Sequence, residues 1–268
     1  MKIVAVIPAR WQSTRLKEKV LVDICGKSML QHVWEKVKKA HEVDEVIVAC
    51  DKERVLKAAE AFGAKCMFTS PEHSSGTDRL SEIAGSVDAD VYINVQADEP
   101  MIDPLMIDNL AQVFEYEKNI TMATLIKRID KKEDITDPNV VKVVVDRKGF
   151  ALYFSRSPIP YMRRSFFGEE DLSAESDDQL TNGYYKHIGL YSYTKDFLFT
   201  YRNLPRSVLE MDEKLEQLRV LEHGYKIKTI ETRHETIGVD TQEDLDRVRE
   251  IFAEEKEKAK YGGEHEEK

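Results

Sequence analysis

Short apolar runs alternate with helical periods along the first hundred residues of the chain. Runs rich in Val and Ile predict strands, and stretches with apolar residues roughly every three or four positions predict helices. The expected order is strand 2–7, helix 28–40, strand 45–50, helix 52–62, strand 65–69, helix 77–86 and strand 90–96. This alternation is typical of an α/β fold whose mainly parallel, mixed sheet is covered by helices on both faces.

The alternating pattern changes after a further helix that begins at Pro104. Two short β runs, Val140 to Val145 and Phe150 to Phe154, flank Asp146-Arg147-Lys148-Gly149, in which Gly supplies the turn conformation of a hairpin. We therefore expect a small β-rich excursion at about residues 135–195. Such an excursion is the natural place for an acceptor pocket or an oligomer contact.

The remaining chain contains one irregular segment and one charged tail. Residues 163–183 are acidic and Ser-rich without a sustained period, which favours a solvated surface insertion over a lid. The elements expected after it are strand 187–193, helices 195–202 and 211–223, strand 226–231, and a helix from about 242. Thr241 and Asp244 resemble a capping box at that last helix, and Glu254 to Lys268 is expected to fray. We predict one domain over 1–250 and a charged tail over 251–268.

Composition limits the partners of the protein. The 268 residues include 40 Lys and Arg against 50 Asp and Glu, and the formal net charge of -10 argues against a broad nucleic-acid surface. Three cysteines without paired metal-ligand spacing argue against a disulfide framework or a zinc site and favour a reducing cytoplasm. No run approaches the roughly 18 apolar residues needed to span a bilayer, and no leader precedes the first strand. We expect a cytoplasmic protein without membrane or nucleic-acid partners.

The first strand ends in a cationic loop. Pro8 and Ala9 are followed by Arg10, Arg15 and Lys19. Because ligands of open α/β sheets bind beyond the carboxyl ends of the strands, these cations can meet a polyanion such as a nucleoside triphosphate. A solvated basic loop is the alternative. Neither the dinucleotide fingerprint nor the P-loop motif is present, so side chains and ordinary backbone amides would hold the phosphates.

Two aspartates follow other predicted strands. Asp98 closes the strand 90–96, and a carboxylate beside a triphosphate is typical of a Mg²⁺ site. Asp240 precedes the last helix and could share the same ion. The alternative is that Asp98 or Glu99 caps the helix after Pro100, and that Asp240 is likewise a helix cap.

A further loop joins a strand to a helix through Ser74-Ser75-Gly76-Thr77-Asp78-Arg79. Gly76 allows a ligand to approach the backbone closely, and Arg79 offers a planar guanidinium, so the loop could hold a base and a ribose. The alternative is a helix N-terminus capped by Thr77.

Ordered blocks cover nearly all of the chain up to about residue 250. They are Val6-Ile7-Pro8-Ala9-Arg10, Ser13-Thr14-Arg15-Leu16, Lys19, Ser75-Gly76-Thr77-Asp78-Arg79-Leu80, Asn94-Val95-Gln96, Asp98-Glu99-Pro100, Pro138-Asn139-Val140-Val141-Lys142-Val143-Val144, Tyr153-Phe154-Ser155-Arg156, Pro158-Ile159-Pro160-Tyr161, His187-Ile188-Gly189, Leu215-Glu216-Gln217-Leu218-Arg219 and Gly238-Val239-Asp240-Thr241. Together they resemble the motifs of the 3-deoxy-manno-octulosonate (Kdo) cytidylyltransferases, or CMP-Kdo synthetases.

The resemblance implies a nucleotidyltransferase fold, usually a homodimer, that joins CTP and Kdo to give CMP-Kdo and pyrophosphate with Mg²⁺, for lipopolysaccharide synthesis. It implies that CTP is bound by Pro8, Ala9, Arg10, Ser13, Arg15, Lys19, Ser75, Gly76 and Arg79. It implies a Kdo pocket of Gln96, Arg156, His187, Tyr191, Glu216 and Gln217, with Arg156 facing the sugar carboxylate. The metal ligands would be Asp98 and Asp240, which act in catalysis together with Arg15 and Lys19.

Two departures from the family pattern leave alternatives open. Leu16 is followed by Lys17-Glu18-Lys19 where the family usually has Pro-Gly-Lys, and Ala97 stands where the family has Gly. The acceptor could therefore be an amino-substituted Kdo or another 2-keto sugar acid. A nucleotidyltransferase for a sugar 1-phosphate is a second alternative, and a non-catalytic nucleotide-binding assembly protein is a third.

Overall fold

The computed structural model describes residues 1–11, 16–73, 75–162, 181 and 183–261. The chain forms two compact units from alternating segments. Unit 1 contains Met1, Ala89–Ile93 and Asp108–His234, and unit 2 contains Lys2–Asp88, Asn94–Ile107 and Glu235–Lys268. The predicted single domain over 1–250 stays a prediction.

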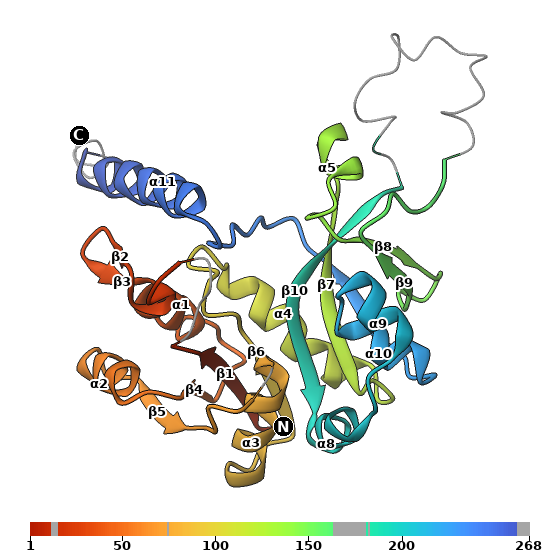
Figure 1. The fold of residues 1–268 in the computed structure, drawn as a ribbon, viewed down its shortest axis with the longest axis horizontal. Coiled ribbons are helices and arrows are strands. Elements are labelled where there is room, and N and C mark those ends of the chain that lie inside the picture. The colour runs from red at the N-terminus through yellow and green to blue at the C-terminus, as the bar shows by residue number, and fades with distance from the viewer. Residues whose placement is uncertain (12–15, 74, 163–180, 182, 262–268) are drawn as a thin grey trace, which may run out of the picture. The chain divides into compact units, whose positions relative to one another are not determined.

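Unit 2 is built on parallel strands with helices around them (Figure 1). Its elements are β1 (Ile3–Ala9), the 3-10 turn η1 (Lys19–Leu21), β2 (Asp23–Ile24), β3 (Lys27–Ser28), α1 (Met29–Val37), β4 (Glu45–Cys50), α2 (Glu53–Ala61), β5 (Lys65–Phe68), α3 (Gly76–Ser86) and α11 (Gln242–Tyr261). The strand order is β1-β4-β5, and both pairs are parallel. Val4, Ala5, Val6 and Ile7 are all fully buried, as expected for a strand covered on both faces.

Local sequence signals set the helix boundaries in unit 2. The Ser28 hydroxyl accepts a hydrogen bond from the Gln31 amide and begins α1. A reciprocal capping box of Ser75 and Asp78 begins α3, so the cap is Ser75 rather than Thr77.

The C-terminal helix α11 packs into unit 2 through Leu245 and Val248, which join a core cluster with Ile24, Met29 and Val239. Thr241 and Asp244 form the expected reciprocal cap at its start. The expectation that the chain frays from Glu254 is wrong as far as Tyr261, because α11 continues to that residue. Alternating charges support this exposed end, as in the pair of Glu254 and Lys258 one turn apart.

Unit 1 is a mixed sheet with helices (Figure 1). Its elements are most of β6 (Val91–Asn94) and of α4 (Pro104–Tyr116), together with β7 (Met122–Arg128), α5 (Lys132–Thr136), β8 (Lys142–Val145), β9 (Ala151–Ser155), β10 (Tyr185–Thr194), α8 (Lys195–Asn203), α9 (Val208–Glu213), α10 (Gln217–Glu222) and β11 (Lys228–Glu231). The order is β11-β7-β10-β6, with β8 pairing β10 and β9. The pair β11/β7 is parallel, whereas β10/β7, β10/β8 and β8/β9 are antiparallel.

The predicted hairpin is confirmed, because β8 and β9 pair antiparallel and Gly149 has a φ of 74° at the turn. The prediction of one helix over 211–223 is wrong. Lys214 adopts a left-handed conformation with φ 56° and ends α9, and a second helix, α10, begins at Gln217. The side chains of Arg219 and Glu210 form an ion pair that joins the two short helices.

The predicted α/β fold with a mixed sheet is confirmed. Within the part of the chain that the structure describes, no helix has both the length and the apolar character needed to cross a bilayer.

Candidate active site

Lys19 connects two aspartates that are far from it in the sequence. Lys19 is 8% exposed, and Nζ donates hydrogen bonds to Asp98 Oδ2 at 2.7 Å and to Asp240 Oδ1 at 2.6 Å. The backbone also joins these segments, because the Val239 amide donates to the Asp98 carbonyl at 2.9 Å. Unit 2 therefore brings three of the predicted catalytic residues together at one point.

The charges around Lys19 decide its ionisation. Burial alone would lower the pKa of Lys19, but the charges of Asp98 and Asp240 and the hydrogen bonds to them outweigh burial and raise the pKa above its usual value. The pKa of neighbouring Glu99 is also raised, to about 8, because burial and the charge of Asp98 both disfavour its carboxylate form. At neutral pH Lys19 is therefore an ammonium group, and Glu99 beside it is mostly protonated.

The two aspartates have the chemistry of a magnesium site. Both carboxylates reach the same cationic atom, Lys19 Nζ, and carboxylate oxygens are the ligands that Mg²⁺ prefers. Among the described residues, no group of three or more His, Cys, Asp or Glu side chains could hold a metal ion. A magnesium ion at this point would therefore complete its coordination with water and phosphate oxygens, as it does in most nucleotide sites.

The first loop contains an unusual backbone conformation. Glu18 has φ 55° and ψ 31°, the left-handed conformation that glycine adopts most easily. Its carboxylate accepts a hydrogen bond from Arg54 Nη1 at 3.2 Å, and the Arg54 guanidinium lies 5.1 Å from the centre of the Trp11 ring. Glu18 thus adopts a conformation that suits glycine, the residue usual in the family pattern, and its charge is paired with Arg54. Ser13 and Arg15 lie outside the described residues.

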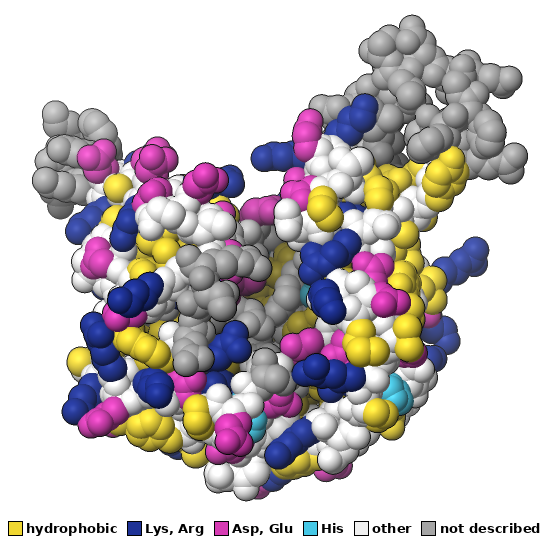
Figure 2. Space-filling view, in the orientation of Figure 1, with side chains coloured by type: hydrophobic (Ala, Val, Ile, Leu, Met, Phe, Trp, Pro, Cys, Tyr) yellow, Lys and Arg dark blue, Asp and Glu magenta, His cyan; other side chains and the backbone are white. Residues whose placement is uncertain are grey.

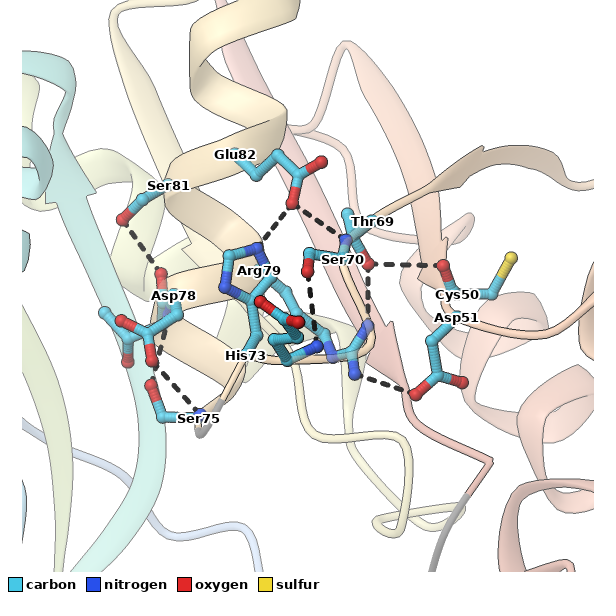
Figure 3. Close-up of polar contacts among 12 residues, drawn as sticks. Cys50, Asp51, Thr69, Ser70, His73, Ser75, Asp78, Arg79, Ser81 and Glu82 are labelled. Atoms are coloured by element: carbon cyan, nitrogen blue, oxygen red, sulfur yellow. Dashed lines mark hydrogen bonds and ion pairs between the residues drawn. The ribbon is translucent and has the colours of Figure 1, made fainter.

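Arg79 is buried, with 1% of its surface exposed. Its guanidinium donates to Thr69 Oγ1 at 2.7 Å and to Asp51 Oδ2 at 2.8 Å (Figure 3). Asp51 also accepts a hydrogen bond from the Trp11 amide at 2.9 Å. Arg79 therefore holds Asp51, and Asp51 holds the start of the first loop. Sequence reasoning missed Asp51, although it directly follows β4 at a carboxyl end, where ligand sites are expected.

Gly76 is packed closely against the end of β1. A Cβ atom at this position would lie 3.5 Å from Pro8 Cγ and 3.6 Å from Asn94 Nδ2. Asn94 is 2% exposed, and its Oδ1 has no hydrogen-bond partner among the described residues. Ala9 is fully buried. Arg10 is exposed, and Gln96 is half-buried.

Unit 1 contains the other predicted sugar-binding residues. Arg156 Nε donates to the Glu213 carbonyl and Nη1 donates to the Pro138 carbonyl, both at 2.8 Å. The Glu213 carboxylate accepts hydrogen bonds from the Arg156 amide at 2.9 Å and from the Ser155 hydroxyl at 2.6 Å. These contacts fix the direction of the guanidinium. Glu213 was missed because it lies 57 residues from Arg156 in the sequence.

His187 and Tyr191 lie together on β10. Their ring centroids are 5.3 Å apart, and Phe154 contacts the His187 ring edge-on at 5.0 Å. Burial lowers the pKa of His187 to about 3 and raises the pKa of Tyr191 well above its usual value. Both side chains are therefore neutral at physiological pH, which favours hydrogen bonding over general-base catalysis for His187.

The structure places Glu216 and Gln217 at the start of α10. The Glu216 carbonyl accepts a hydrogen bond from the Tyr201 hydroxyl at 3.0 Å. Gln217 is 4% exposed, and among the described residues its Nε2 has no hydrogen-bond partner.

The low pKa of His187 makes stability depend on pH. As the pH falls below 6.5, the unfolded chain takes up a proton on this side chain that the folded protein does not bind until about pH 3. We therefore expect His187 to lower the free energy of unfolding by about 1.4 kcal/mol per pH unit within this window. His187→Gln should remove that part of the slope in urea unfolding measured over the same window.

The matched control is His41→Gln, because His41 is exposed. This variant should keep the parent slope. Equal slopes in the parent and in His187→Gln would contradict the neutral state of the half-buried His187.

Known proteins that this chain resembles include cytidylyltransferases. The cytidylyltransferase family model matches residues 4–230. A 3-deoxy-manno-octulosonate cytidylyltransferase of Geotalea uraniireducens is 51% identical over 92% of this chain and 98% of its own length. The corresponding protein of Solibacter usitatus is 49% identical over 94% of each chain.

Solved structures agree with these relatives. A CMP:2-keto-3-deoxy-manno-octonic acid synthetase complexed with CTP superposes with a TM-score of 0.87 at 44% identity and covers 95% of this chain and 100% of its own. A 4-diphosphocytidyl-2C-methyl-D-erythritol synthase of Anaerococcus prevotii has a TM-score of 0.59 at 13% identity over 94% of this chain and 98% of its own, which is a likeness of fold alone. With half of its residues identical over nearly the full length of such relatives, the chain belongs to the 3-deoxy-manno-octulosonate cytidylyltransferase family.

Proposed function

We propose that this chain is the CTP-dependent enzyme that activates Kdo to CMP-Kdo with release of pyrophosphate, a step that supplies lipopolysaccharide synthesis. The identity of about half of the residues with named Kdo cytidylyltransferases carries this proposal. The cationic and acidic cluster in unit 2 and the polar aromatic group in unit 1 are consistent with a nucleotide and a sugar acid as substrates.

The chemistry that we propose is an in-line displacement. The anomeric hydroxyl of Kdo attacks the α-phosphorus of CTP, and pyrophosphate leaves. Phosphoryl transfer asks a protein mainly for positioning and for cations where negative charge accumulates. Arg15 and Lys19 would neutralise the leaving group. Arg156, held by two carbonyls, would present its guanidinium to the sugar carboxylate.

A divalent ion belongs to this proposal. Asp98 and Asp240 would hold Mg²⁺, and Lys19 would then have to exchange its carboxylate contacts for contacts with phosphate oxygens. The ion would polarise the α-phosphate.

The products of the purified protein test the proposed function. We expect mass spectrometry to detect CMP-Kdo and pyrophosphate from CTP and Kdo with Mg²⁺, and little product from the other three nucleoside triphosphates. A panel of acceptors should include amino-Kdo, other 2-keto sugar acids and sugar 1-phosphates. Preference for a sugar 1-phosphate would contradict the proposal, and CTP binding without any product would indicate an assembly protein instead.

We also propose that the protein is a homodimer that buries an apolar surface of β9 and α9. Leu152, Val208 and Met211 are 61%, 58% and 48% exposed. The two elements are joined by hydrogen bonds from Ser155 and Arg156 to Glu213. Hydrophobic side chains are exposed over this region (Figure 2). Such a cluster on a monomer favours association.

Leu152→Asp should shift the protein from dimer to monomer in light scattering, because a charge would have to be buried at the interface. Tyr116→Ser is the matched control, since Tyr116 is 79% exposed and lies at the end of α4. A parent protein that is monomeric at micromolar concentration would contradict this proposal.

A further inference from the structure

The hydroxyl of Thr124 lies within hydrogen-bonding distance of three polar groups. Thr124 is fully buried in the middle of β7, and Oγ1 lies 3.0 Å from His187 Nε2 on β10. The same oxygen lies 2.9 Å from the Leu190 carbonyl and 3.2 Å from the Ile188 carbonyl. Three groups of one strand thus converge on a single hydroxyl of its neighbour.

An irregularity in β10 creates this arrangement. His187 pairs with Ile126 and Ile188 with Leu125, but the next paired residue is Tyr191, opposite Thr124. Gly189 and Leu190 are therefore additional residues in β10, typical of a bulge. The bulge brings the carbonyls of Ile188 and Leu190 to the same side chain.

The number of available protons determines the hydrogen-bond directions. A hydroxyl has one proton, and both carbonyls can only accept. The proton is therefore donated to a carbonyl, with Leu190 the nearer. Nε2 must then be the N–H group, and it donates to the lone pair of Thr124 Oγ1. The opposite arrangement would place two buried carbonyls against an oxygen lone pair, which is unfavourable.

The other ring nitrogen of His187, Nδ1, is therefore a hydrogen-bond acceptor. In a neutral imidazole, protonation at Nε2 leaves Nδ1 as an acceptor. Burial keeps this ring neutral at physiological pH, because it lowers the pKa of His187 to about 3. Phe154 and Tyr191 contact the ring and restrict its rotation. Within the described ranges, no residue forms a hydrogen bond with Nδ1.

We propose that Thr124 is a positioning residue, which holds His187 as the Nε2–H tautomer so that Nδ1 accepts a hydrogen bond from a hydroxyl of the acceptor sugar. The proposal rests on the proposed function, in which His187 contacts that sugar. It also goes beyond that function. An unprotonated Nδ1 can only accept a hydrogen bond, so the tautomer selects a sugar that carries a hydrogen-bond donor, such as a hydroxyl, at this position.

Nuclear magnetic resonance of the protein labelled with ¹⁵N-histidine tests the tautomer without any substrate. His187 is one of 7 histidines, and its signals can be assigned as those missing from His187→Gln. We expect Nε2 to be protonated and Nδ1 unprotonated in the parent protein. Thr124→Val keeps the shape but removes the hydroxyl, so its His187 should show a mixture of tautomers or the Nδ1–H form, and Thr124→Ser should restore the parent signals.

Steady-state kinetics give the second readout. Thr124→Val should raise KM for the sugar acid about tenfold, the effect expected of one misdirected hydrogen bond, with KM for CTP unchanged. Thr124→Ser should return KM for the sugar acid to near the parent value. A purely structural role of Thr124 would change both KM values or neither.

Failure of this inference differs from failure of the proposed function. A protonated Nδ1 in the parent, or an unchanged tautomer in Thr124→Val, would overturn the role of Thr124 even in an active enzyme. Absence of CMP-Kdo synthesis by the parent would overturn the proposed function, while the tautomer measurement would still report on Thr124. The parent spectrum also tests the proposal if Thr124→Val does not fold.

Discussion

Asp98→Asn should lower kcat/KM about 10²-fold to 10³-fold at saturating Mg²⁺, the loss typical of removing one preorganised electrostatic contact from an active site. The amide keeps the shape of the carboxylate, and its oxygen can still accept the hydrogen bond that Lys19 Nζ donates at 2.7 Å. The substitution therefore removes charge and leaves the geometry of η1 nearly unchanged. Initial rates of pyrophosphate release measure the effect.

Glu243→Gln is the matched control for Asp98→Asn. Glu243 is an exposed acidic residue in the first turn of α11, close in sequence to Asp240 but outside the ion-pair cluster. It should keep the parent rate. Calorimetry should also detect weaker binding of Mg²⁺ and CTP together to Asp98→Asn. Turnover within a few-fold of the parent at saturating Mg²⁺ would show that the charge of Asp98 is not used in catalysis.

The sequence predicts those parts of the site whose signals are local. Lys19 and Asp98 follow recognisable strands, and Asp240 precedes a capped helix, so their approach could be anticipated from the rule that ligands meet the carboxyl ends of parallel strands. The strands were also predictable from a local signal. Buried parallel strands are continuous apolar runs in the sequence, as in Val4 to Ile7.

The parts that could not be predicted depend on pairing between distant residues. Thr124 looks like an ordinary β-forming residue in its strand, and only the bulge in β10 reveals its hydroxyl contacts. The break between α9 and α10 has no Gly or Pro signal, since Lys214 itself adopts the left-handed conformation. Asp51 likewise becomes informative only when Arg79, 28 residues later, is found against it.

Asp51→Asn should lower the free energy of unfolding by about 3–5 kcal/mol, the usual effect of removing one partner from a buried ion pair. The side chains of Arg79 and Asp51 are 1% and 5% exposed, so water cannot replace the lost carboxylate. The amide oxygen can still accept the hydrogen bond from the Trp11 backbone, and Thr69 still accepts from Arg79. The loss would therefore come from the uncompensated buried charge. Urea unfolding measures it.

Two further variants separate this explanation from general disruption of the fold. Glu53→Gln removes the partner of Lys57 in a pair whose side chains are 69% and 71% exposed, and it should cost less than about 0.5 kcal/mol because water screens both charges. Arg79→Met combined with Asp51→Asn removes the stranded cation and should be more stable than Asp51→Asn alone. Two outcomes would contradict this explanation. The double variant could be less stable than Asp51→Asn alone, or Asp51→Asn could lower the free energy of unfolding no more than Glu53→Gln does. In either case, the buried charge pair would not be what stabilises the contact of Asp51 with Arg79.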